Sequence, residues 1–208
     1  MTDKKYDHIY TVCLTGGAGS GKSLISRMLK GMGYTVLDSD SITREQVMRP
    51  GYAGFDGIVD FFGREILDRE GEIDRKKLAL IVFADEEKLA KLNSITHPAT
   101  VSEINTLIRA AEKNGEKLIF VESAIPFVAD FDSFCDEFWY IRADKEERIG
   151  RLMASRGYSR EKAESIFASQ PPESLYLEKC KRIIDNPDNA DFEQTEKRIK
   201  EIIEDILA

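Results

Sequence analysis

The amino-acid sequence predicts an α/β protein with a doubly wound parallel sheet into which a long helical segment is inserted. Three observations indicate this fold class. An apolar run over 9–14 leads through a glycine-rich loop into a helical pattern, short apolar strands alternate with helices later in the chain, and the middle of the chain carries only helical patterns. Strands that alternate with helices form parallel sheets, whose ligands bind at the carboxyl ends of the strands.

The composition restricts the classes of partner. With 208 residues the chain is long enough for one core with an insertion. A net charge of -8 argues against binding nucleic acid or acidic membranes through bulk charge. We find no signal-peptide or membrane-span pattern, and three cysteines without metal-ligand spacing. We therefore expect a cytoplasmic protein with reduced thiols, a monomer or weak homo-oligomer, and no nucleic-acid or membrane partner.

The first strand is followed by the segment GGAGSGKS, Gly16 to Ser23, which matches all fixed positions of G-x-x-x-x-G-K-[ST]. Glycines in such a loop let successive N–H groups point inward toward anionic oxygens at a helix N-terminus. Lys22 would reach the β- and γ-phosphates, and the Ser23 hydroxyl would ligate Mg²⁺. A turn that is merely rich in glycine is the other interpretation, but the strand–loop–helix context favours a nucleoside triphosphate site of the P-loop NTPase type.

Four further strands complete a predicted five-stranded sheet. They are expected at 34–37, 117–121, 137–141 and 182–184. The second leads into Asp38-Ser39-Asp40 and the third into Glu122. These acids and the P-loop follow the carboxyl ends of strands, so they can converge on one site.

The helical patterns give the domain organisation. Asp74 and Asp191 are placed to cap helices, and the residue pair His97-Pro98 is expected to break one. A helical, arginine-rich segment follows Asp144 and is interrupted at 157–159. We expect a nucleotide-binding core over 1–48 and 116–208, with a lid at about 145–172, and a helical substrate domain over 49–115.

The acids at the strand ends are candidates for the transfer chemistry. One well-placed carboxylate can orient an acceptor hydroxyl and accept its proton late in phosphoryl transfer. We prefer Asp40 for this role, with Asp38 supporting it or linked to Mg²⁺, although either acid alone can simply cap the next helix. Glu122 closes its strand in the manner of a Walker B acid that holds Mg²⁺ directly or through water; a solvated acid is the other interpretation.

Clustered basic residues are candidates for binding phosphate and an acidic substrate. Those of the arginine-rich segment can close over the nucleotide, or can be ordinary solvent-exposed residues of a helix. They are Arg148, Arg151, Arg156 and Arg160. Arg44, Arg49 and Arg75 flank the helical insertion, where an acidic substrate can bind. A lone histidine such as His97 is more often structural than catalytic.

Several segments together carry a family resemblance. They are CLTGGAGSGKS, LDSDSITREQV, RPGYAGFDGIVDFFGREIL, GEIDRKKLALIVF, LNSITHP, RLMASRGYSREKAESIFASQ and IIDN. On these segments, over nearly the whole chain, the sequence resembles the dephospho-CoA kinases. The order and spacing of the segments is more specific than the P-loop alone, which fits many families.

The resemblance implies ATP-dependent phosphorylation of the ribose 3′-hydroxyl of dephospho-CoA, the last step of coenzyme A synthesis. It implies Asp40 as general base, Arg44, Arg75 and His97 on the acceptor side, and Arg151 as the lid arginine near the transferred phosphate. The nucleotide-binding residues that we expect are Gly17, Ala18, Gly19, Ser20, Gly21, Lys22, Ser23, Leu24, Arg148 and Asn186, the last close to the adenine. For Mg²⁺ we expect Ser23, Asp38 and Glu122.

The chain departs from the family pattern at several positions. Val128 stands where the family usually has a glutamate after the third strand. The second arginine of the lid, Arg156, lies one residue further along the chain than the family pattern places it. Leu24 follows Ser23 where threonine or valine is commoner. Two other functions stay open from the residues: another small-molecule P-loop kinase, such as a shikimate-kinase-like enzyme, and a nucleotide-binding regulatory module without transfer chemistry. The sequence lacks the Gly-Gly-Gly acceptor loop expected of the first alternative. It also lacks the Asn-Lys-x-Asp motif by which a GTPase-type regulatory module would read its base.

Overall fold

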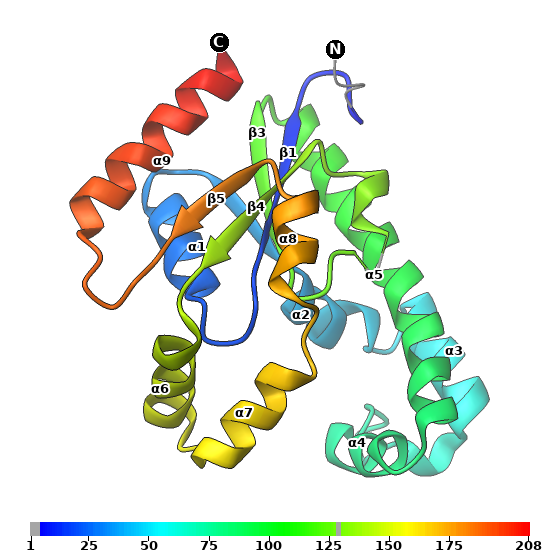
Figure 1. The fold of residues 1–208 in the computed structure, drawn as a ribbon. Coiled ribbons are helices and arrows are strands. Elements are labelled where there is room, and N and C mark those ends of the chain that lie inside the picture. Colours follow the sequence, from blue (N-terminus) through cyan, green and yellow to red (C-terminus); the bar gives the residue numbers. More distant parts are fainter. Residues whose placement is uncertain (1–4, 128–129) are drawn as a thin grey trace. The chain divides into compact units, whose positions relative to one another are not determined.

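The computed structural model describes residues 5–127 and 130–208, which form two compact units (Figure 1). Unit 1 contains residues 1–37 and 111–208, and unit 2 contains residues 38–110. The chain thus passes from unit 1 to unit 2 after residue 37 and returns after residue 110. The domain boundaries expected from the sequence were after residues 48 and 115. None of the helices in the described part of the chain is long and apolar enough to cross a membrane.

Unit 1 is built on the predicted five-stranded sheet. Its strands are β1 (Tyr10–Thr15), β2 (Thr35–Asp38), β3 (Leu118–Glu122), β4 (Glu137–Arg142) and β5 (Arg182–Asp185), in the spatial order β2-β3-β1-β4-β5. β1 runs parallel to both β3 and β4, and β4 runs parallel to β5. The register aligns Leu14 with Glu122. The acid that ends β3 is therefore brought beside the end of β1, where the glycine-rich loop begins.

Helices cover both faces of this sheet (Figure 1). α1 (Lys22–Gly31) and α9 (Phe192–Leu207) bury Ile25, Leu29, Ile199 and Ile203 against β-strand side chains that include Phe120 and Trp139. On the other face lies α8 (Glu173–Lys179), whose Tyr176 ring stacks on Tyr140 of β4 at 4.8 Å. The continuous apolar runs of the inner strands follow from burial on both faces.

The arginine-rich segment of unit 1 forms two helices, α6 (Lys145–Arg156) and α7 (Arg160–Ala168). Gly157, in the left-handed conformation with φ 63°, ends α6, and the Ser159 side chain caps α7. The predicted interruption at 157–159 is confirmed. A short 3₁₀ turn, η3 (Phe131–Ser133), precedes β4.

Unit 2 is helical around its own small core. Its elements are α2 (Ser39–Ile42), the π-helical turn η1 (Thr43–Val47), α3 (Ala53–Phe62), the 3₁₀ turn η2 (Arg64–Ile66), α4 (Arg75–Phe83) and most of α5 (Glu86–Lys113). The core side chains are Ile58, Phe62, Ile66, Ile73, Leu78 and Val82. Asp74 caps α4 and Asp191 caps α9 through side-chain hydrogen bonds, as predicted.

The expected helix break at His97-Pro98 is wrong, because α5 continues through Pro98. Proline has no N–H for the preceding turn, which usually ends or kinks a helix. Here the Thr96 hydroxyl donates to the carbonyl of Leu92, and Thr96 and Thr100 are buried on either side of the proline. The Thr100 hydroxyl also lies 2.7 Å from the hydroxyl of Thr43 in η1, so packing within unit 2 favours a continuous helix where the local sequence favours an end.

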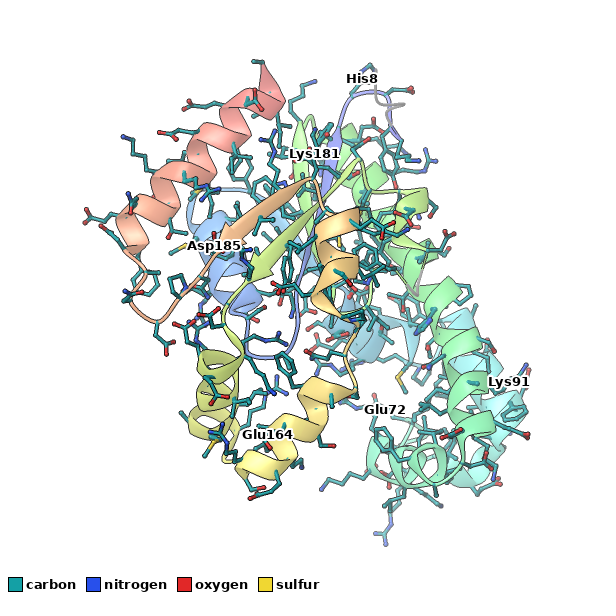
Figure 2. All side chains as sticks on the ribbon, in the orientation of Figure 1. His8, Glu72, Lys91, Glu164, Lys181 and Asp185 are labelled. Carbon is teal, nitrogen blue, oxygen red and sulfur yellow. The ribbon has the colours of Figure 1, made fainter. Side chains whose placement is uncertain are left out.

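A buried charge lies at the amino end of the sheet. Glu137, with 1% of its side chain exposed, pairs with Lys181 at 2.6 Å and Arg182 at 3.2 Å and accepts from Nε1 of Trp139 at 2.7 Å. Lys181 and Asp185 lie at opposite ends of β5 (Figure 2). This network is therefore remote from the edge of the sheet that carries the glycine-rich loop.

Candidate active site

The loop between β1 and α1 is shaped to receive anionic oxygens. Gly19 and Gly21 have φ angles of 77° and 94°, in the left-handed region that disfavours residues with a Cβ. Gly21 is the N-cap of α1 and offers no side chain to the first N–H groups of the helix. Those N–H groups and the positive end of the helix dipole suit a phosphate group.

Side chains hold this loop through its carbonyl oxygens. Their donors come from the start of α1, from α6 and from the residue after β5. Nζ of Lys22 donates to Gly16 (2.6 Å) and Gly17 (3.3 Å), Nε of Arg148 to Ala18 (2.9 Å), Nη1 of Arg151 to Gly19 (3.2 Å), and Nδ2 of Asn186 to Ser20 (2.8 Å). The loop is thus fixed by cationic and amide donors on its carbonyl side, and the N–H of Ser20 donates within the loop to Gly17 at 3.2 Å. Leu24, expected among the nucleotide-binding residues, donates its N–H to the carbonyl of Gly21 at 2.9 Å.

Arg148 is buried directly beside the loop. Its guanidinium lies 4.3 Å from the centre of the Phe167 ring and donates to the side chain of Gln170. A Cβ added at Gly17 would overlap both Arg148 and Gln170. Burial lowers the pKa of the Arg148 guanidinium, and no carboxylate of residues 5–127 or 130–208 forms an ion pair with it. An unneutralised cation in this position suits the oxygens of a polyphosphate.

The other arginines of α6 and α7 differ in their contacts. Arg160 pairs with Glu146 at 2.6 Å and with Glu164 at 3.0 Å, so it links the two helices at the surface. Arg156 is exposed in the last turn of α6. Arg151 instead pairs with Asp188 at 2.8 Å, in the loop that follows β5.

Oxygen ligands for a metal ion meet at the end of β3. The Ser23 hydroxyl lies 3.1 Å from Oε1 of Glu122, and the Ser26 hydroxyl lies 2.7 Å from Oε2. No group of three or more histidine, cysteine or acidic side chains that could hold a metal occurs within the described ranges. Hydroxyl and carboxylate oxygens nevertheless fit Mg²⁺, which retains waters and substrate phosphates as ligands.

In unit 2, the two acids after β2 have different surroundings. The Asp38 carboxylate accepts hydrogen bonds from the N–H groups of Asp40 and Ser41 and from the Ser41 hydroxyl, so it is the N-cap of α2. Asp40 is exposed in the first turn of that helix. The capping interpretation therefore holds for Asp38, while Asp40 keeps an accessible carboxylate.

The residues expected on the acceptor side also belong to unit 2. Arg44 donates to the Ser41 hydroxyl at 3.1 Å, and Arg75 is the exposed first residue of α4. His97 is half-buried in α5, and this burial lowers its pKa, which favours a neutral imidazole. Unit 2 thus supplies two accessible guanidinium groups for an anionic ligand.

Sequence reasoning missed three contributors. Ser26 lies one turn after Ser23 on α1, a spacing that could have marked it as a second partner of Glu122. Asp188 belongs to no motif, and Phe167 lies in a family segment without an assigned role, so both roles follow only from contacts with arginines distant in the sequence. Val128, which replaces a family glutamate, lies outside the described residues.

Comparisons with known proteins show the family to which the chain belongs. A family model described as dephospho-CoA kinase matches residues 10–191. A dephospho-CoA kinase from Carboxydothermus hydrogenoformans is 38% identical over 191 residues, which cover 92% of this chain and 91% of that protein.

Solved structures show the same fold. TT1252 from Thermus thermophilus superposes with a TM-score of 0.79 and 26% identity, covering 97% of this chain and all of that one. Dephospho-CoA kinase from Campylobacter jejuni superposes with a TM-score of 0.68 at 24% identity, covering 94% of this chain and 96% of its own.

Proposed function

Because the chain belongs to the dephospho-CoA kinase family, we propose that it phosphorylates the ribose 3′-hydroxyl of dephospho-CoA with ATP. The products are coenzyme A and ADP, and the reaction is the last step of coenzyme A synthesis. The observation that carries the proposal is a family match over residues 10–191 that includes an intact phosphate-binding loop.

We assign ATP to the loop of unit 1. The first N–H groups of α1, which no side chain caps, are suited to bind the phosphates, and Lys22 to bind their β- and γ-oxygens. Arg148 is positioned to stabilise charge that develops during transfer, because it is a buried cation without a carboxylate partner in the described part of the chain. Asn186 is assigned to the adenine side on the family resemblance.

We assign Mg²⁺ to Ser23 and Glu122. When bound there, the ion would neutralise the negative charge of the polyphosphate. Asp38 is a weaker candidate, because its carboxylate already caps α2 with three hydrogen bonds. Support for the metal assignment is the chemistry of the hydroxyl and carboxylate oxygens.

We assign the acceptor to unit 2, with Asp40 as the base. The acceptor oxygen forms a bond to the γ-phosphorus while the bond from that phosphorus to the β–γ bridging oxygen breaks, and the hydroxyl proton passes to the Asp40 carboxylate. The exposed carboxylate suits this role. Arg44 and Arg75 would hold anionic groups of dephospho-CoA, and the neutral His97 would donate or accept a hydrogen bond.

The two other functions considered from the sequence are not favoured. The curated relatives that match most of the chain carry the name dephospho-CoA kinase, and none of the observations specifically supports a shikimate-type acceptor or a regulatory module.

The test is an acceptor assay with purified protein, Mg²⁺ and ATP. Phosphorus NMR should show a new 3′-phosphomonoester on dephospho-CoA and one ADP formed for each coenzyme A. Shikimate and a reaction without acceptor should give no more than background ADP. If dephospho-CoA gains no phosphate while another acceptor does, the proposed substrate is wrong.

We further propose a cytoplasmic protein that is a monomer or weak homo-oligomer and has no nucleic-acid or membrane partner. The net charge of -8 and the buried free thiols of Cys13, Cys135 and Cys180 support this assignment. Light scattering after size-exclusion chromatography tests the oligomeric state.

A further inference from the structure

Five successive carbonyl groups of the phosphate-binding loop, from Gly16 to Ser20, accept hydrogen bonds from side chains. In a loop that cradles an anion, the N–H groups face inward and the carbonyl groups face away. A bond to one of these carbonyls does not by itself keep Lys22 or Arg148 from a ligand, whereas a side chain with every nitrogen engaged on the carbonyl side has no donor left for the cradle. Arg151, expected from family resemblance to lie near the transferred phosphate, is one of these donors.

The guanidinium of Arg151 is occupied at all three nitrogens. Nη1 donates to the carbonyls of Gly19 (3.2 Å) and Ser20 (3.4 Å), Nη2 donates to the carbonyl of Asn186 (2.8 Å), and Nε donates to Oδ1 of Asp188 (2.8 Å). The side chain is only 23% exposed, whereas that of Asp188 is 63% exposed. Arg151 thus connects the phosphate-binding loop to the loop after β5, and Asp188 holds it there.

We propose that Arg151 is a positioning residue, which with Asp188 fixes the phosphate-binding loop before the nucleotide arrives and does not itself contact the transferred phosphoryl group. The inference rests on the proposed nucleotide site. Donors fixed in advance bind an anion with a smaller loss of conformational entropy. A cation on the carbonyl side also polarises the peptide units, which makes the inward N–H groups stronger donors.

The two possible roles of Arg151 differ in their effect on ADP. A residue that shapes the whole loop contributes to binding the phosphates that ATP and ADP share. A residue that contacts the transferred group contributes to ATP alone. The ratio of ATP to ADP affinity therefore distinguishes positioning from direct contact.

The experiment measures dissociation constants for ADP and for a non-hydrolysable ATP analogue by calorimetry, at fixed Mg²⁺ and without acceptor. We expect Arg151→Gln to weaken both ligands by the same factor, on the order of 10, as for loss of hydrogen bonds from a charged group. Asp188→Asn should weaken both by a smaller common factor, and the double variant should bind no more weakly than Arg151→Gln. Arg27→Gln, which changes an exposed arginine of α1, is the matched control and should bind like the unchanged protein.

Amide hydrogen exchange without nucleotide gives an independent measurement. Amide exchange in the loop over 16–21 should be faster in Asp188→Asn than in the unchanged protein. Because Asp188 lies at the surface, this variant can be measured even if Arg151→Gln fails to fold. The proposal is overturned if only the ATP analogue binds more weakly, if neither ligand is affected, or if the two substitutions act additively. Because the acceptor is absent, these outcomes do not depend on whether dephospho-CoA is the substrate.

Discussion

The carboxylate of Glu122 accepts a hydrogen bond from the hydroxyl of Ser23, at 3.1 Å between oxygens. One residue ends β3 and the other lies in the first turn of α1, and they are 99 residues apart in the sequence. The parallel register of β1 and β3 brings them together. This pair is our candidate for holding Mg²⁺ beside the phosphate-binding loop.

Replacing Glu122 by glutamine should raise the Mg²⁺ concentration that gives half-maximal activity by roughly tenfold or more, as loss of a metal's supporting carboxylate does. Titration of activity with Mg²⁺ at saturating ATP measures the shift. Glu178→Gln, at an exposed acid on α8, should leave the titration unchanged. An unchanged Mg²⁺ requirement in Glu122→Gln would remove Glu122 from the metal site.

Asp40→Asn should lower kcat by a factor of about 10² or more, because an amide cannot accept the proton of the acceptor hydroxyl. The dissociation constant for ADP should stay within a factor of about two, since the proposed role of Asp40 concerns the acceptor hydroxyl and ADP lacks the transferred phosphate. Steady-state kinetics and calorimetry measure the two quantities. Asp60→Asn, at an exposed acid of α3, serves as the control, and near-normal turnover in Asp40→Asn would place the base elsewhere.

Gly17→Ala should lower kcat/KM for ATP roughly tenfold or more, because the added methyl group would overlap the Arg148 guanidinium and displace it from the loop. Gly31→Ala is the control, since a Cβ there meets no atom within 4 Å. Both variants should unfold at temperatures close to that of the unchanged protein. Normal kinetics in Gly17→Ala would show that the position of Arg148 is unimportant for ATP.

Glu137→Gln should destabilise unit 1 by about 3 kcal/mol, because it leaves Lys181 and Arg182 without their buried counter-charge. Fluorescence of Trp139, the single tryptophan, reports unfolding by denaturant. Kinetic constants of the folded variant should be unchanged, since the network lies at the amino end of the sheet.

The same variant tests the pH dependence of stability. Burial alone would raise the pKa of Glu137, but hydrogen bonds from Lys181 and Trp139 hold it below its ordinary value near 4.5. The carboxylate therefore stabilises the fold above that value, and the contribution is lost as the pH falls through the lower, folded-state pKa. The unfolding free energy of Glu137→Gln should fall less steeply with acidification below pH 4.5. Equal slopes would show that Glu137 does not titrate differently in the folded state.

Much of the fold could be predicted because its signals are local. Strands β1 and β3 end within one residue of the expected positions, and the cap at Asp74 and the turn at Gly157 lie where they were expected, because each signal depends on a few neighbouring residues. The continuity of α5 through Pro98 could not be predicted, because the burial of Thr96 and Thr100 opposes the local preference of proline for a helix end. Among the site residues, the part that Arg151 plays depends on Asp188, which is 37 residues further along the chain.

The sequence by itself determined the phosphate-binding loop, the order of strands and helices, and the family to which the chain belongs, since backbone freedom, hydrophobic period and motif spacing are properties of the chain. Only the tertiary structure decided which atoms of that loop each cation contacts. A guanidinium group can donate to carbonyl as well as to phosphate oxygens, so its partner in the folded chain depends on where parallel strand register and helix packing place it. For Arg151, that placement is on the carbonyl side of the loop.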